Sequence, residues 1–201
     1  MTASAALARL RAGNQRYVQR VHSIDSLLSH DRRVGDETPP FAIVLGCSEP
    51  RAPAEIVFDQ GVGDLFVIRV AGNVADLSQI GSVEFAAQRF GTRLVVVMGH
   101  TECGAIDAAL ASSTSDLAIS SGHLHSIINR VRPAIEALRP LHEHDWPGLR
   151  RHVIRANVRT SVDQLRHGSE VLERLTRIRE LVVVGAELDV ASGADTFLDE
   201  A

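Results

Sequence analysis

Four short runs of aliphatic residues dominate the hydrophobic pattern of this chain. They cover residues 41–46, 65–70, 94–99 and 181–185. Each run is almost continuously apolar, a pattern typical of strands buried on both faces, as the strands of a parallel sheet are. We therefore expect these four runs to form the centre of the fold.

Helical patterns lie between and around the apolar runs. Residues 80–90 are crowded with apolar side chains, and residues 119–138 and 153–178 form longer patterns with charged outer faces. Strands that alternate with helices predict βαβ units with right-handed crossovers. The prediction is an α/β fold, a single domain of residues 1–201 whose central, mainly parallel sheet of four or five strands is flanked by helices.

The N-terminal part of the chain predicts a helix followed by an arm. Residues 4–18 place Leu7, Leu10 and Tyr17 at helical spacing, and residues 22–40 are polar and end in two prolines. An amphipathic helix attached through a long arm can pack on a partner subunit or on its own subunit, and the pattern leaves both arrangements open. We expect the helix and arm, residues 1–38, to pack on a partner subunit.

The composition excludes several classes of function. The 21 Lys and Arg residues are balanced by 25 Asp and Glu residues, so the net charge of −4 offers no electrostatic footprint for nucleic acid or an anionic membrane. No apolar run approaches the roughly 20 residues that a membrane-spanning helix needs. The first residues also lack the basic-then-apolar order of a signal peptide, so we expect a cytoplasmic protein.

Two cysteines and a histidine carry the candidate chemistry. Cys47 directly follows the first apolar run, and His100 and Cys103 follow the third. Because the carboxyl ends of parallel strands meet at one edge of a sheet, these three side chains can converge there. Each residue alone is most simply a packed core residue. Together they predict one zinc ion per chain, because thiolates favour zinc and a Cys₂His set leaves an open position typical of catalytic sites.

Longer motifs around these residues resemble those of the β-class carbonic anhydrases. The matching blocks are residues 47–51 (Cys-Ser-Glu-Pro-Arg), 54–61, 63–73, 81–86 and 99–105 (Gly-His-Thr-Glu-Cys-Gly-Ala), within a resemblance that runs from Leu7 to Phe197. The resemblance implies zinc on Cys47, His100 and Cys103, hydration of CO₂ to bicarbonate, and a homodimer or homotetramer. It also implies that Gly104 lines the substrate pocket.

The resemblance further implies a gate made of an acid and an arginine. In the family, an Asp two residues after the first Cys pairs with an Arg while the site is open, and binds the zinc when the site is closed. Here the acid is Glu49, the next residue is Pro50, and the arginine is Arg51. Glu49 and Arg51 are therefore the expected catalytic pair, with Glu49 as a fourth metal ligand in the closed state. Its extra methylene leaves two outcomes open, a working gate or a permanently blocked metal.

Arg69 is a further candidate. In some bacterial members this position belongs to a pocket for regulatory bicarbonate, but Val44 stands where those members have a Trp. A strand-end arginine paired to a buried carboxylate is the equally simple structural explanation.

Three functions follow from these residues. The leading prediction is CO₂ hydration by zinc-bound hydroxide, with activity that climbs with pH into the mildly alkaline range because two thiolates acidify the bound water less than three histidines do. One alternative is hydrolysis of a related small electrophile. The other is a non-catalytic or gated homologue that binds zinc and bicarbonate while Glu49 blocks the metal.

Overall fold

A computed structural model of the chain describes residues 1–23, 38–113, 121–142 and 145–198. Its centre is a sheet with the strand order β2-β1-β3-β4-β5. The first four strands in that order are parallel, and β5 runs antiparallel to β4. The strands are β1 (Ala42–Gly46), β2 (Leu65–Arg69), β3 (Leu94–His100), β4 (Val182–Leu188) and β5 (Asp195–Phe197). This arrangement confirms the predicted mainly parallel α/β sheet.

Helices cover both faces of the sheet. On one face, α1 (Ala3–Val18) and α3 (Ala54–Val57) pack on the strands. On the other face lie α4 (Leu77–Phe90), α7 (Trp146–His167) and α8 (Glu170–Arg177). Both clusters contain aliphatic residues of β1, β3 and β4, which explains why these strands are apolar along their whole length.

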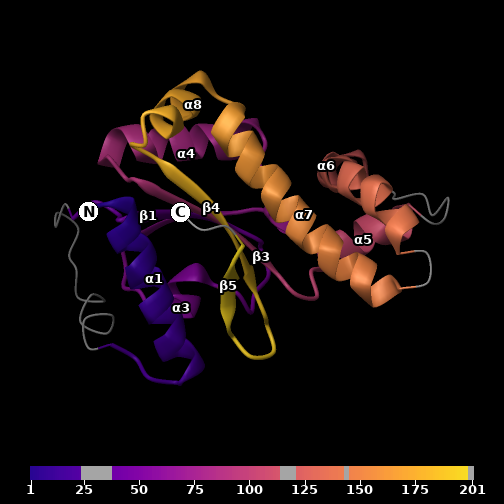
Figure 1. Ribbon diagram of the computed structural model, residues 1–201, viewed down its shortest axis with the longest axis horizontal. Helices are drawn as coiled ribbons and strands as arrows, with labels where there is room; N and C mark the ends of the chain where they lie inside the picture. Colours follow the sequence, from indigo (N-terminus) through magenta and orange to yellow (C-terminus); the bar gives the residue numbers. More distant parts are fainter. Residues whose placement is uncertain (24–37, 114–120, 143–144, 199–201) are drawn as a thin grey trace.

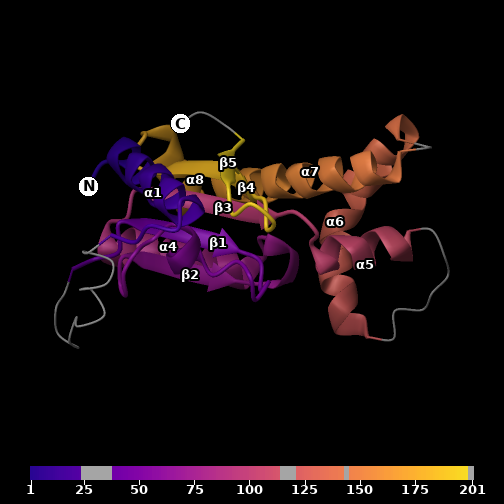
Figure 2. The same ribbon diagram turned by 90° about the horizontal axis from the view of Figure 1, so that it is seen from below.

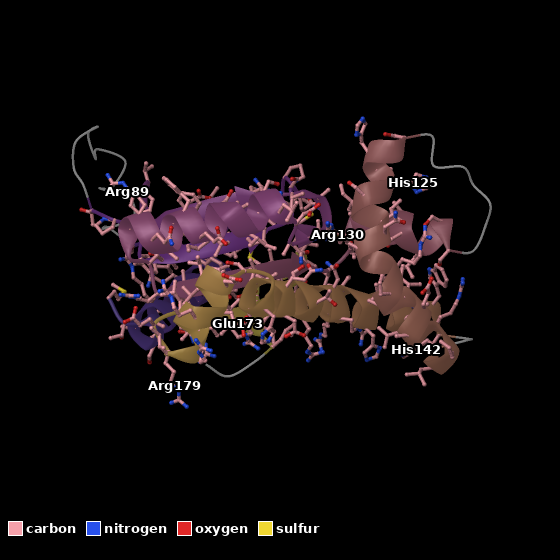
Figure 3. All side chains as sticks on the ribbon, turned by 90° about the horizontal axis from the view of Figure 1, so that it is seen from above. Arg89, His125, Arg130, His142, Glu173 and Arg179 are labelled. Carbon is pink, nitrogen blue, oxygen red and sulfur yellow. The ribbon has the colours of Figure 1, made fainter. Side chains whose placement is uncertain are left out.

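A separate group of helices lies beyond the carboxyl ends of the strands. It consists of α5 (Gly104–Ser112), α6 (Gly122–Leu138) and the short η3 (Arg139–Leu141). In Figures 1 and 2, α5 and α6 lie together at one end of the molecule, and α7 connects them to the part that holds α4 and α8. Arg130 of α6 lies near α4 (Figure 3) and forms a 2.5 Å ion pair with Asp76, the N-cap of α4. This helical group and the sheet enclose the site described below.

The helix α1 packs on its own chain. Leu7 and Leu10 are buried in the same cluster as Phe58 and strand residues of the sheet. Arg16 adds a 2.5 Å ion pair to Asp59, a buried carboxylate. Packing of residues 1–38 on a partner subunit stays a prediction, and residues 24–37 of the arm lie outside the described residues.

The C-terminal helical prediction is wrong in one respect. The pattern over residues 153–178 forms two helices, and the first of them begins earlier, at Trp146. The break falls at Gly168 and Ser169, because the Ser169 side chain accepts a hydrogen bond from Leu172 N and caps the second helix. Within the described residues, no helix is both long enough and apolar enough to cross a membrane.

Candidate metal centre

The three predicted ligands meet at the carboxyl edge of the sheet. Cys47 follows β1, His100 is the last residue of β3, and Cys103 is the N-cap of α5. Since Gly46 pairs in register with Met98, the ends of β1 and β3 lie side by side. All three side chains are buried, and their ligand atoms lie within 4.8 Å of one another.

The spacing of the two sulfur atoms fits a tetrahedral zinc ion. Cys47 Sγ and Cys103 Sγ lie 3.9 Å apart, and both cysteines are free. Two thiolates bound to one tetrahedral zinc at about 2.3 Å each lie about 3.8 Å apart. The sulfurs therefore have the separation of two ligands of one ion rather than that of a disulfide, whose sulfurs are about 2.0 Å apart.

His100 is oriented as a metal ligand. Its Nδ1 lies 2.8 Å from the carbonyl oxygen of Thr101, which accepts a hydrogen bond from the ring when Nδ1 carries the proton. Its Nε2 is buried and has no hydrogen-bond partner among the described residues. A ligating histidine typically donates its other N–H to a carbonyl in this way, which fixes the tautomer and frees the second nitrogen for the metal. An ion held by the two sulfurs would satisfy this buried nitrogen.

The turn from His100 to Cys103 is held by hydrogen bonds to the end of β4 and to the residues that follow it. Thr101 N donates to Leu188 O at 2.9 Å, and Thr101 Oγ1 accepts from Val190 N at 3.0 Å. Glu102 takes the left-handed conformation with φ of 57°, and this turn leads from His100 to Cys103. The loop is thus fixed by its backbone as well as by its ligands.

The electrostatics of the two cysteines are coupled. The Cys103 thiol donates to Cys47 and lowers the pKa of Cys47 to about 4, against the effect of burial, with help from His100 and from Gly72 N–H at 3.3 Å. The same hydrogen bond, together with burial, raises the pKa of Cys103. For His100, burial acts to lower the pKa, but the neighbouring Cys47 sulfur and the Thr101 carbonyl raise it overall. The two sulfurs therefore share one proton, which a dication would release on binding.

The segment that donates to Cys47 is itself supported by α7. Gly72 lies in η2 (Ala71–Asn73) with φ of 72°, a conformation that suits glycine. Asn157 Nδ2 donates to Gly72 O at 2.7 Å, and Ser161 Oγ donates to Asn73 O at 3.0 Å. This support could not be predicted from the sequence, since a backbone N–H leaves no signal in a residue pattern.

Glu49 and Arg51 form the predicted pair. Arg51 donates to Glu49 Oε1 from its Nε at 2.6 Å and from its backbone N at 3.2 Å. The Arg51 side chain lowers the pKa of Glu49 to about 2, with a smaller contribution from the Arg51 backbone N–H. In this structure the carboxylate is engaged by Arg51, and the three-residue cluster of metal-ligating atoms consists of Cys47, His100 and Cys103.

Two other predicted positions lie next to the cluster. Gly104 begins α5, and a Cβ at this position would meet nothing within 4 Å, so open space adjoins the loop there. Arg69, at the end of β2, donates from Nε to Cys47 O at 3.0 Å and from Nη2 to Glu49 O. Its observed partners are thus backbone carbonyls rather than a buried carboxylate.

Comparisons with known proteins agree with this site. A family model described as "Carbonic anhydrase" matches residues 42–194. The chain is 39% identical to carbonic anhydrase 2 of Mycobacterium tuberculosis over 132 residues, which cover 65% of this chain and 63% of that protein. It is 34% identical to a carbonic anhydrase of Pseudomonas aeruginosa over 170 residues, 81% of this chain and 74% of that protein. The match thus spans less than two thirds of the length of the M. tuberculosis relative.

Solved structures give the same result. The β-carbonic anhydrase CafA of Aspergillus fumigatus superimposes with a TM-score of 0.74 at 29% identity, covering 98% of this chain and 91% of that one. One of two β-carbonic anhydrases of Sordaria macrospora, described as tetrameric, superimposes with a TM-score of 0.71 at 22% identity, covering 80% and 81%. The chain therefore belongs to the β-class carbonic anhydrase family.

Proposed function

We propose that this protein is a zinc-dependent carbonic anhydrase that catalyses the reversible hydration of CO₂ to bicarbonate and a proton. The observation that carries the proposal is the buried set of two sulfurs at 3.9 Å and one unpartnered histidine nitrogen. Membership of the β-class family supports the same activity. In this proposal Cys47, His100 and Cys103 hold one zinc ion per chain.

Zinc at this site would lower the pKa of a coordinated water toward neutrality and so provide a nucleophile for CO₂. Two features of the neighbouring residues suit that chemistry. Arg51 holds the Glu49 carboxylate, and the exposed Gly104 leaves the start of α5, next to Cys103, free of crowding by a side chain. Buried surroundings strengthen the electrostatic effect of the metal on any group beside it.

Glu49 decides between the catalytic site and the blocked site. The blocked alternative requires the Glu49 carboxylate to leave Arg51 and to ligate the metal at all times. The 2.6 Å ion pair favours the arrangement in which the acid stays with Arg51. We therefore propose that Glu49 works as the family acid does, as a gate that binds the metal only in a closed state.

The activity can be tested by isotope exchange. Zinc-loaded protein should deplete ¹⁸O from labelled CO₂ in membrane-inlet mass spectrometry, and Cys103→Ala, which removes one ligand, should not. Zinc content should approach one ion per chain in the wild type and fall in the variant. Full zinc occupancy without exchange would contradict the proposal and favour the blocked site.

We also propose that the active protein is a homodimer or homotetramer. The Sordaria macrospora structures are described as tetrameric, and they share the fold of this chain. The edge strand β2 is only partly buried in the single chain, with Phe66, Val67 and Ile68 at intermediate exposure. An edge strand of this kind is commonly covered by another element or subunit.

A further inference from the structure

Arg69 joins the edge of the sheet to the loop that follows Cys47. It is the last residue of β2 and pairs in register with Gly46, the last residue of β1. From there its Nε donates to Cys47 O at 3.0 Å, and its Nη2 donates to Glu49 O. One planar guanidinium thus bridges the backbone of a predicted metal ligand and the backbone of the gating acid.

Among the described residues, the other hydrogen bonds of Glu49 come from within its own loop. Ala52 N donates to Glu49 O at 3.1 Å, and Arg51 donates to the carboxylate from both its side chain and its backbone. These donors move with the loop, whereas Arg69 is anchored on β2. Because Pro50 has no N–H, the loop can form one backbone hydrogen bond fewer within itself. Arg69 therefore ties the loop to the rigid sheet.

We propose that Arg69 is a positioning residue that fixes the backbone of residues 47–49 and so keeps the Glu49 carboxylate with Arg51 and off the metal. The inference rests on the proposed zinc site. Glu has one more rotatable bond than the family Asp. The Glu49 carboxylate can therefore reach either the Arg51 guanidinium or a metal ion held by the cysteines and His100. The position of the backbone at Cys47 and Glu49 determines whether this carboxylate pairs with Arg51 or binds the metal. The planar guanidinium of an arginine can donate to both carbonyls at once, whereas the ammonium group of a lysine is less suited to this geometry.

The test uses protein loaded with Co²⁺, whose visible spectrum reports the ligands of the metal, and azide as a probe of the open position. Wild-type protein should bind azide with a clear spectral change. Arg69→Gln should weaken azide binding by about tenfold or more, which corresponds to about 1.4 kcal/mol, because the Glu49 carboxylate competes for the metal. Arg69→Lys, which keeps one donor group, should lie between them.

Two further variants separate positioning from general damage. Arg69→Gln combined with Glu49→Gln should recover azide binding, because the competing carboxylate is gone. Arg93→Gln is the matched control, since Arg93 also donates to a backbone carbonyl, that of Glu180, and lies next to the opposite end of β3. It should bind azide as the wild type does.

The outcomes are distinct. Wild-type azide affinity in Arg69→Gln overturns the inference, and so does a loss that the added Glu49→Gln change does not restore. A wild-type protein that does not bind azide overturns it as well, because Glu49 would then occupy the metal despite Arg69. If the predicted azide pattern appears but CO₂ is not hydrated, the positioning role stands and the proposed activity fails.

Discussion

At the scale of single residues, Glu49 has the most direct influence on the chemistry of the site. Its carboxylate accepts two hydrogen bonds from Arg51, and its pKa of about 2 keeps it ionised throughout the working pH range. A charged acid this close to a metal site either stays with its arginine or becomes a ligand. The structure has it with the arginine.

The Glu49→Asp variant tests whether the longer side chain impairs the site. Because Glu49 already forms the ion pair expected of the family Asp, we expect CO₂ hydration to change by less than about tenfold, or about 1.4 kcal/mol in the barrier. Stopped-flow hydration assays on both proteins at equal zinc content measure this ratio. A much larger gain in the variant would mean that Glu49 obstructs the native metal.

Asp195 is expected to make the free energy of unfolding depend on pH. Both of its carboxyl oxygens are buried without a hydrogen-bond partner in the described chain, and burial together with Glu187 raises its pKa to about 7. An unfolded chain loses this proton near pH 3.9. Folding therefore takes up a proton between about pH 4 and about pH 7, and the stability that depends on it falls as the pH rises through that window.

The Asp195→Asn variant should remove this pH dependence, since an amide does not ionise. From the shift of about 3 pKa units, the wild type should lose up to about 4 kcal/mol more stability than the variant between pH 4 and pH 8. Urea unfolding of both proteins at the two pH values measures the difference. Parallel pH profiles would show that Asp195 is ionised in the folded protein.

At the scale of elements, α1 depends on a close approach to the chain beneath it. A Cβ added at Gly13 would lie 1.7 Å from Phe58 O. The carbonyl of Phe58 therefore occupies the space that a side chain at position 13 would need. Gly81 in α4 is the matched control, because a Cβ there meets nothing within 4 Å.

The two Gly→Ala variants should therefore have opposite effects. Gly13→Ala should lower the free energy of unfolding by about 1–3 kcal/mol or more, because the helix must move away from Phe58. Gly81→Ala should leave it unchanged or raise it by up to about 1 kcal/mol through helix propensity. Chemical unfolding measures both changes, and equal effects at the two positions would contradict the close packing of α1 on Phe58.

The elements that could be predicted from the sequence are those with a strong local pattern. The four apolar runs became β1 to β4, and the helices α1, α4 and α6 lie where their periodicity indicated. The break between α7 and α8 was missed because Ser169 acts as a cap only in its folded setting. The strand β5, of three residues, carries too short a pattern to predict, and its pairing with β4 depends on the folded chain.

In the candidate site, too, some features could be predicted from the sequence and others could not. Cys47, His100 and Cys103 could be predicted to converge because parallel topology fixes where strand ends meet. The roles of Gly72 N–H, the Thr101 carbonyl and Arg69 could not be predicted, since each depends on a backbone position in three dimensions. The sequence pattern thus predicted which three side chains converge, and the structure was needed to find what holds them in place.

At the scale of the whole molecule, the single chain leaves apolar surface uncovered. Phe85 of α4 is 54% exposed and Leu77 is 84% exposed, and Phe85 packs beside Phe66 of the edge strand with ring centroids 6.3 Å apart. Exposed apolar surface next to a sheet edge is typical of an interaction surface. Sedimentation velocity should therefore detect a dimer or tetramer at micromolar concentration, and a stable monomer with full activity would contradict the proposed assembly.

In the proposed function, the Cys₂His centre hydrates CO₂ while Arg51 and Arg69 hold Glu49 away from the metal. The most direct measurement is stopped-flow CO₂ hydration by zinc-loaded protein from about pH 6.5 to about pH 9, beside Cys103→Ala. We expect zinc-dependent turnover that rises with pH and is absent from the variant. Full zinc occupancy without turnover at any pH would contradict it, and would mean that Glu49 blocks the site or that the substrate is another molecule.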